Sequence, residues 1–236
     1  MATSPDTSLD LAVIVPVFNE QECIVSVLEE WRCAIGRFVQ NFCIIVIDDG
    51  STDQTPQKLS SLNWSELRIH RHANRGHGQS CLVGYQLAAD AGASYVFQID
   101  SDGQCDPQPF PELWQRRIEA PAVYGRRFKR DDGAARKLVT TVLRWLLKLG
   151  YRTALNDANV PYRLYPAKVA AQAAARVPGD FDLANIALAL LLEPQGFIEV
   201  PIHFRDRSGG HPSVKWWGFG RKALKLIGDL RRLRNG

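Results

Sequence analysis

Two carboxylates one residue apart, Asp100 and Asp102, follow directly on an apolar run from Tyr95 to Ile99. The run is rich in β-branched and aromatic residues, which predicts a buried strand. Parallel strands end at a shared carboxyl edge, where α/β folds bind their ligands. Two carboxylates there could share a divalent cation with phosphate oxygens, because Mg2+ takes one or two carboxylates plus substrate phosphates. A plain turn is the alternative, since Asp, Ser and Gly favour turns.

Three earlier segments are also apolar runs followed by a turn, and we predict a strand for each; they lie at residues 11–17, 42–47 and 67–71. Apolar residues at helical spacing predict helices over 22–37 and 79–90. Strand and helix thus alternate four times in the first 100 residues, which predicts a parallel sheet with helices on both faces. The turns after these strands would meet at one edge of the sheet and form a ligand site. They cover residues 18–20, 48–53, 72–78 and 100–104.

The alternation is looser after Pro107. Apolar spacing predicts further helices over 110–118, 134–149, 167–177 and 181–192. Short apolar runs predict strands over 122–125, 160–165 and 197–204. We expect a charged loop over 126–133. No repeat or clear linker is present, so we expect one domain with a C-terminal extension.

The composition is that of a globular chain, with 236 residues, 45% hydrophobic and 23% charged. The five cysteines are odd in number and contain no C-x-x-C pair, so we expect reduced thiols and no zinc site. The five histidines show no ligand spacing. The polar start, residues 1–10, contains no signal core, so secretion is not expected. The reduced thiols favour a cytoplasmic protein. No apolar run reaches the roughly 20 residues that span a membrane.

The net charge of +4 is unevenly distributed. Residues 205–236 contain nine Lys or Arg and two Asp, a charge of +7, which leaves −3 for the rest. A protein that coats nucleic acid is therefore not expected. Within 216–236, apolar residues recur on one helical stripe after Trp216 and Trp217. This pattern predicts a basic amphipathic helix on an anionic membrane surface, or else a helix packed on its own domain or on a partner.

Short motifs match a known family in order along residues 11–215. They are Val15-Pro16-Val17-Phe18-Asn19-Glu20, Ile47-Asp48-Asp49-Gly50-Ser51-Thr52-Asp53, Asn74-Arg75-Gly76-His77-Gly78, Asp100-Ser101-Asp102-Gly103-Gln104, Gly125-Arg126-Arg127-Phe128, Tyr162-Arg163-Leu164-Tyr165, and Arg205-Asp206-Arg207 with Ser213 and Lys215. No single motif is specific, but the ordered set is. The chain resembles family 2 glycosyltransferases of the GT-A fold. Within them it resembles the polyprenol-phosphate sugar transferases, the group that includes dolichol-phosphate mannosyltransferase.

This resemblance implies an α/β GT-A domain over 11–215. The polar tail over 1–10 precedes this domain, and the basic helix expected from its own pattern over 216–236 follows it. It implies inverting transfer of mannose, glucose or a similar sugar from a nucleotide-diphosphate sugar to a polyprenyl phosphate. The cofactor would be a divalent metal, Mg2+ or Mn2+. The protein would sit peripherally at the cytoplasmic face of the membrane, and a separate membrane subunit stays open as a partner.

The resemblance also assigns the donor side of the site. The residues that would hold the nucleotide and sugar are Pro16, Phe18, Asn19, Glu20, Asp49, Gly76 and Asp100. Asp102 and Gln104 would hold the metal, which neutralises the diphosphate leaving group. Turn and helix-cap chemistry is the alternative for Asp49, and we expect only that for Asp53.

On the acceptor side, the resemblance assigns the phosphate to Arg127, Arg136, Thr140, Arg207 and Lys215. Arg127 joins Asp100 and Asp102 as a catalytic residue. Arg136 and Thr140 are four residues apart, so they share one helix face. Arginine suits bidentate phosphate contacts, although a solvated basic face would show the same residues.

One departure from the family pattern concerns the general base. Many family members that glycosylate a hydroxyl carry an acidic pair at the start of a late helix, whereas this chain has only Asp182 there. A phosphate acceptor is largely ionised at neutral pH and needs alignment more than a base. Transfer to a sugar hydroxyl, with Asp182 as base, is the alternative reaction. A non-catalytic scaffold that binds sugar nucleotides is a third possibility, which donor hydrolysis would exclude.

Overall fold

The computed structural model describes residues 9–127, 155–179, 181, 183–205, 228 and 232. The helix expected over 134–149 lies outside these residues, as does nearly all of the C-terminal helix expected over 216–236. All five cysteines are free thiols, in line with the sequence prediction. Within the described ranges, no helix is long and apolar enough to cross a membrane.

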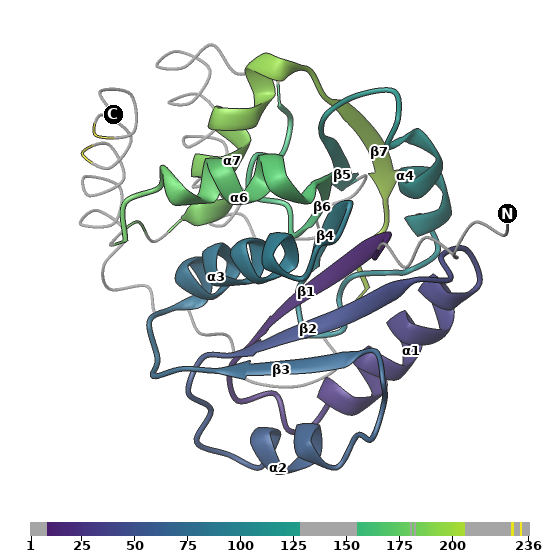
Figure 1. Ribbon diagram of the computed structural model, residues 1–236, viewed down its shortest axis with the longest axis vertical. Coiled ribbons are helices and arrows are strands. Elements are labelled where there is room, and N and C mark those ends of the chain that lie inside the picture. Colours follow the sequence, from purple (N-terminus) through teal and green to yellow (C-terminus); the bar gives the residue numbers. More distant parts are fainter. Residues whose placement is uncertain are drawn as a thin grey trace, which may run out of the picture.

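Seven strands form one sheet in the order β3-β2-β1-β4-β6-β5-β7 (Figure 1). Their bounds are β1 Leu11–Val17, β2 Phe42–Asp48, β3 Leu67–Arg71, β4 Tyr95–Ile99, β5 Val123–Arg127, β6 Tyr162–Pro166 and β7 Ile198–Ile202. Strand β6 runs antiparallel to both of its neighbours, β4 and β5. All other pairings are parallel, so the prediction of a mostly parallel sheet is confirmed.

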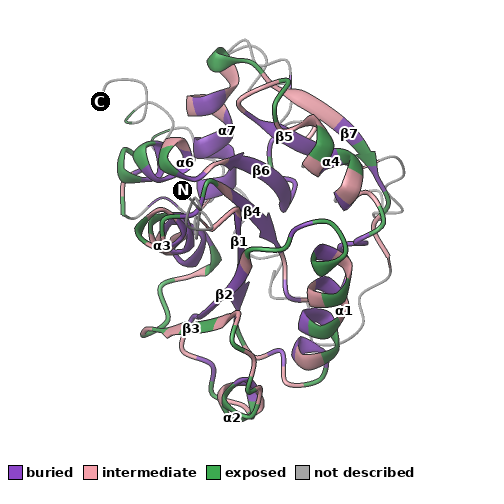
Figure 2. Ribbon diagram, turned by 45° about the vertical axis from the view of Figure 1, so that its right-hand side comes forward, coloured by how far each residue is buried: buried purple, intermediate pink, exposed green. Residues whose placement is uncertain are grey.

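Helices cover both faces of the sheet, as the alternation of elements predicted (Figures 1 and 2). Helices α3, α6 and α7 pack together on one side, whereas α1 and α4 lie on the other. The helix bounds are α1 Ile24–Gly36, α2 Thr55–Ser60, α3 His77–Asp90, α4 Phe110–Arg116, α6 Ala167–Ala175 and α7 Ala184–Leu192. The short helix α2 packs against α1, beyond the β3 edge.

The central strands are buried on both faces, which is why they read as unbroken apolar runs. Every residue of β1 is buried, as the purple ribbon in Figure 2 shows. On the α1 and α4 side, Trp31 lies 5.4 Å from Phe97 and 5.8 Å from Tyr162, measured between ring centroids. Phe110 of α4 lies 5.3 Å from Phe97 and closes this aromatic cluster.

The opposite face of the sheet buries a charge. Arg163 on β6 is fully buried and donates hydrogen bonds to the carbonyl oxygens of Ala158, Val160 and Asn185. Its guanidinium lies 5.5 Å from the ring of Tyr124. The arginine therefore ties the segment before β6 and the first turn of α7 to the middle of the sheet.

Two details differ from the sequence prediction. The charged loop expected from residue 126 begins later, because Arg126 and Arg127 continue β5 and pair with Pro201 and Ile202 of β7. Backbone pairing to an edge strand overrides the polar character of these two side chains. The helix expected over 181–192 begins only at Ala184, after Leu183 adopts a non-helical conformation.

Candidate functional site

A cavity of about 370 Å3 lies at the carboxyl ends of β1, β2, β3 and β4. Its walls come from the turns after these strands and from the first turn of α3: Pro16, Val17, Phe18, Glu20, Asp49, Asn74, Gly76, His77, Ser80, Asp100, Ser101 and Asp102. The sequence predicted that these four turns would meet, and the structure brings them together. Of the residues assigned to the donor, Asn19 is the one that is not part of this lining.

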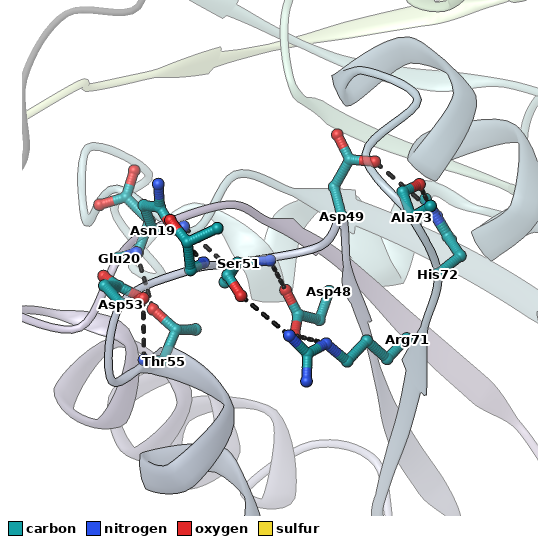
Figure 3. A network of polar contacts seen from close by, with 11 residues as sticks. Asn19, Glu20, Asp48, Asp49, Ser51, Asp53, Thr55, Arg71, His72 and Ala73 are labelled. Atoms are coloured by element: carbon teal, nitrogen blue, oxygen red, sulfur yellow. Dashed lines mark hydrogen bonds and ion pairs between the residues drawn. The ribbon is translucent and has the colours of Figure 1, made fainter.

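The turns after β1 and β2 are joined by hydrogen bonds between side chains and backbone (Figure 3). The backbone N–H of Asn19 donates to Ser51 Oγ at 3.0 Å, and that of Glu20 donates to Thr55 Oγ1 at 2.9 Å. Asn19 has a φ of 55°, a left-handed conformation that Asn tolerates. Its Oδ1 accepts from the N–H of Thr52 at 2.8 Å. Asn19 thus shapes the cavity wall rather than lining it.

Asp53 belongs to the same network, and its role is the turn chemistry that the sequence predicted. Its two carboxylate oxygens accept from the N–H groups of Thr55 and Gln21, at 2.9 and 3.1 Å. Burial alone would raise the pKa of Asp53, but these hydrogen bonds outweigh it and lower the pKa below the usual value. The ionised carboxylate therefore holds the two turns together.

Asp49 lines the cavity and is also bound to the turn after β3. Its Oδ1 accepts from the N–H of Arg75 at 2.7 Å, and its Oδ2 accepts from the N–H of Gly76 at 2.9 Å. Gly76 has a φ of 90°, which favours glycine at the start of α3. The side chain of Asp49 is only 4% exposed. Both of its oxygens are therefore held before any ligand binds.

Asp100, at the end of β4, pairs with a histidine that the sequence did not single out. His77 Nε2 lies 2.9 Å from Asp100 Oδ1, although 23 residues separate them. The sulfur of Cys81, one turn along α3, and the Asp100 carboxylate raise the pKa of His77 well above its ordinary value. Among the described residues of the lining, His77 is the one basic side chain, against the carboxylates of Glu20, Asp49, Asp100 and Asp102.

This surplus of carboxylates fits a divalent cation. No group of three or more potential ligands among His, Cys, Asp and Glu is present among the described residues. The protein part of such a site would be one or two carboxylates, which suits Mg2+ or Mn2+ completed by phosphate oxygens. Asp102 faces the cavity, whereas the amide nitrogen of Gln104 donates to the carbonyl of Arg205 at 3.4 Å.

Gln104 belongs to a turn that is fastened to the end of β7. The N–H of Arg205 donates to the carbonyl of Gln104 at 2.9 Å, and Cys105 pairs with Phe204 in an isolated bridge. The guanidinium of Arg205 contacts Asp106 at 2.9 Å and Glu30 of α1 at 2.7 Å. Arg205 therefore fixes the turn that carries Asp102 and Gln104.

Arg127 lies at the end of β5, where it pairs with Asp157 and stacks 4.9 Å from the ring centre of Phe204. The buried thiol of Cys105 lies close enough to Arg127 and to both carboxylates to feel their charges. Burial raises the pKa of this thiol, Asp100 and Asp102 raise it further, and Arg127 lowers it.

The other residues that the resemblance assigns to the acceptor lie outside the described residues, and so does Asp182; they are Arg136, Thr140, Arg207 and Lys215. The sequence analysis missed His77, His72 and Asp157. They contact Asp100, Asp49 and Arg127, respectively. No sequence spacing predicts these contacts. His77 belongs to one of the family motifs, residues 74–78, but only the structure shows its contact with Asp100.

A model of glycosyl transferase family 2 matches residues 12–167. The chain belongs to this family. The matched part runs from β1 to the start of α6 and so contains all four turns of the cavity. The family resemblance expected from the motifs is therefore confirmed.

Curated family relatives carry the name undecaprenyl-phosphate 4-deoxy-4-formamido-L-arabinose transferase. The protein from Serratia proteamaculans is 26% identical over 161 residues, which cover 66% of this chain and 48% of the relative. The protein from Pectobacterium carotovorum is 27% identical over 166 residues, which cover 68% and 50%. The chain thus spans about half the length of these relatives.

Solved structures of similar fold include glucosyl-3-phosphoglycerate synthase from Mycobacterium tuberculosis. Its complex with Mn2+, uridine-diphosphate and phosphoglyceric acid has a TM-score of 0.68 at 20% identity, covering 95% of this chain and 78% of that chain. Its complex with Mn2+ and uridine-diphosphate-glucose has a TM-score of 0.66. At this identity the likeness concerns the fold, and it confirms the GT-A type of α/β architecture.

Proposed function

We propose that this protein is a glycosyltransferase that moves a sugar from a nucleotide-diphosphate donor to a polyprenyl phosphate. One observation carries the proposal: Asp100 and Asp102 face the same cavity as Asp49, at the shared edge of four parallel strands. Membership of the family and the names of the curated relatives support the activity and the acceptor class.

The cavity supplies what a nucleotide-sugar donor needs. Phe18, 43% exposed, and Pro16 offer apolar surface for a planar base. Asp49 offers carboxylate oxygens for N–H or O–H donors of the nucleoside. Asp100 and Asp102, at the other strand end, are suited to the diphosphate through a divalent cation.

A metal would neutralise the charge that develops on the leaving diphosphate. Without a cation, the four carboxylates of the lining would repel a diphosphate. When protonated, His77 would reduce this repulsion at Asp100, since its ring lies 2.9 Å from one carboxylate oxygen. The side chains would thus orient the donor and offset its charge. The bonds that form and break in the reaction are between substrate atoms.

On the acceptor side, we propose that Arg127 aligns the phosphate that attacks the anomeric carbon. One phosphate oxygen would form the new bond as the sugar–diphosphate bond breaks, so the configuration inverts. An ionised phosphate needs no proton removed by the protein. The hydroxyl-acceptor alternative requires Asp182 as base, and the two cases differ in which substitution stops turnover.

The deciding experiment offers a panel of nucleotide sugars to the protein with one short polyprenyl phosphate and follows product mass. A polyprenyl-phosphate sugar from at least one donor is the expected result. Donor consumption with a sugar hydroxyl as acceptor would support the alternative reaction. Binding without any turnover or donor hydrolysis would indicate a sugar-nucleotide scaffold.

We further propose that the +7 segment after residue 204 holds the protein peripherally at the cytoplasmic face of a membrane. A polyprenyl phosphate presents its headgroup at that surface, so a basic helix there would bring the cavity to its acceptor. In this proposal, the catalytic domain spans residues 11–215, and a separate membrane subunit is a further partner.

A further inference from the structure

The carboxylate of Asp102 takes its direction from the backbone two residues further along the turn. Asp102 Oδ1 accepts from the N–H of Gln104 at 3.1 Å. Gly103, which lies between the two residues, has a φ of 77°, a left-handed conformation that favours glycine. A shift of the Gln104 backbone would therefore turn the carboxylate that faces the cavity.

The backbone of Gln104 is held by the end of β7, on another part of the chain. The N–H of Arg205 donates to the Gln104 carbonyl at 2.9 Å, and the bridge between Cys105 and Phe204 lies next to this bond. The carbonyl of Arg205 can only accept, so the amide nitrogen of Gln104 is the atom that faces it, at 3.4 Å. The amide oxygen of Gln104 thus points away from Arg205, and oxygen is the atom that a hard cation binds.

The guanidinium of Arg205 anchors this backbone through Asp106. Nη2 lies 2.9 Å from Asp106 Oδ1, which also accepts from the N–H of Gln108 at 2.9 Å. Asp106 is buried, and an ionised carboxylate that loses its cationic partner inside a protein is strongly destabilised. The second partner of the guanidinium, Glu30, has a side chain that is 39% exposed, and a pair this exposed contributes little. Arg205 therefore holds the turn mainly through Asp106.

We propose that Arg205 is a positioning residue for the divalent cation. Its ion pair with Asp106 keeps Gln104, and through Gln104 the Asp102 carboxylate, in the arrangement that binds the metal. Arg205 is not among the described residues that line the cavity, so it acts through the turn and not on the ligand. The inference rests on the proposed function, because a metal-bound diphosphate is part of that function, and it adds a residue that sets the metal affinity.

The charge of Arg205 and its positioning role predict opposite effects on the metal. A cation beside an acidic site repels Mn2+, so by charge alone its removal would strengthen metal binding. By position, its removal would weaken metal binding, since substitution of groups that orient metal ligands typically costs about 10- to 100-fold in affinity. The direction of the change in metal affinity therefore separates the two effects.

The test titrates Mn2+ into the whole chain at a fixed concentration of uridine diphosphate and, in parallel, of guanosine diphosphate. Equilibrium dialysis of the labelled nucleotide gives the Mn2+ midpoint, the concentration at which nucleotide binding is half of its maximum. Arg205→Met removes the ion pair, whereas Arg205→Met combined with Asp106→Asn removes both charges and leaves no carboxylate buried without its cation. Glu30→Gln is the matched control, because it removes the other partner of the same guanidinium. Thermal unfolding of each variant reports whether it is folded.

We expect the Mn2+ midpoint to rise by about 10- to 100-fold in Arg205→Met, with nucleotide binding restored at high Mn2+. The double variant should regain thermal stability but keep the raised midpoint, which neither unfolding nor a change of net charge explains. Glu30→Gln should leave the midpoint within about threefold of that of the unchanged protein. If neither methionine variant folds, Arg205→Lys decides the question, because it keeps the charge without the planar fork and should also raise the midpoint.

A midpoint that is unchanged or lowered in a folded Arg205 variant would overturn the inference and leave the proposed function standing. Nucleotide binding that is equally tight in EDTA would overturn the metal role and this inference together. If neither nucleotide binds the unchanged protein at any Mn2+ concentration, the proposed function fails, and the inference fails with it.

Discussion

Arg127 and Asp157 form a two-point ion pair across 30 residues of sequence, with Nε 2.6 Å from Oδ2 and Nη2 3.1 Å from Oδ1. The carboxylate uses one edge of the planar guanidinium, which has five N–H donors in total. The N–H groups of Nη1 point away from the edge that Asp157 uses, and such an edge is suited to a second anion. Asp157 therefore orients Arg127, and the ion pair need not break if Arg127 binds the acceptor phosphate as proposed.

The first prediction separates the two acceptor chemistries. With polyprenyl phosphate at neutral pH, Arg127→Ala should lower turnover by about 10- to 100-fold, because each charge-assisted contact is worth about 1.5–3 kcal/mol. Asp182→Asn should cost much less, since no proton leaves the nucleophile. A larger loss in Asp182→Asn would reject the phosphate acceptor, because general-base catalysis supplies about 100- to 10,000-fold. Arg116→Ala, which removes the arginine at the end of α4 that pairs with Glu119, is the control.

A second prediction concerns the metal. Calorimetric titration with a nucleoside diphosphate should show binding that requires Mg2+ or Mn2+ and is lost in Asp102→Ala. The reason is the acidic lining, which repels a diphosphate unless a cation lies between them. Asp90→Ala is the control. It removes a carboxylate at the far end of α3, where Gln86 donates to it, and should leave the affinity for the nucleoside diphosphate unchanged. The metal role would be rejected by an affinity that EDTA leaves unchanged.

The parts of the fold that the sequence predicted are those whose signal is local. A parallel strand buried on both faces must be apolar along its whole length, so β1 and β2 were visible as runs. The acidic and glycine-containing turns after these strands were visible for the same reason, and they do meet in one cavity. Strand order is not local: nothing near Tyr162 reports that β6 inserts antiparallel between β4 and β5.

The contacts that the sequence could not predict are through-space pairs. Both His77 with Asp100 and His72 with Asp49 join residues more than twenty positions apart, brought together only by parallel pairing. Their histidines show no periodicity, so the sequence pattern carried no signal for them. Arg127 was expected in a loop because its side chain is charged, yet its backbone pairs with Ile202.

The third prediction places the C-terminal segment on a membrane. Truncation after Lys215 should abolish sedimentation with anionic vesicles, because it removes six of the nine Lys and Arg that follow residue 204. Raised salt should weaken sedimentation of the whole chain, since it screens the same charges. Neutral vesicles serve as the control. Equal sedimentation of the truncated protein would show that the anchor lies elsewhere.

The fourth prediction tests the turn network through pH. Asp53→Ala should lower the free energy of unfolding by about 1–2 kcal/mol at pH 7, through the lost bonds to Thr55 and Gln21. The pKa of Asp53 is lowered from 3.8, so its contribution is full above that pH and disappears as the pH falls through the folded pKa. Urea unfolding should therefore show a smaller difference in the free energy of unfolding between the unchanged protein and Asp53→Ala at about pH 3 than at pH 7. Glu119→Ala, an exposed surface partner, should change little at either pH.

The last prediction concerns the buried Arg163. Arg163→Met should lower the free energy of unfolding by about 3 kcal/mol, because the carbonyls of Ala158, Val160 and Asn185 lose a donor. The loss is less than three full hydrogen-bond penalties, because methionine also removes the cost of burying a charge. Arg163→Lys should be intermediate, since an ammonium keeps the charge but cannot reach all three carbonyls with a planar fork.

Urea unfolding of these variants is compared with Arg68→Met, an exposed arginine on the edge strand β3, which should shift stability by less than about 0.5 kcal/mol. The segment that Arg163 holds also carries Asp157, the partner of Arg127. A folded Arg163→Lys should therefore raise the KM for polyprenyl phosphate and leave the Kd of the nucleoside diphosphate unchanged. If Arg163→Met is as stable as the unchanged protein, the desolvation cost of the guanidinium cancels its hydrogen bonds, and Arg163 does not anchor that segment.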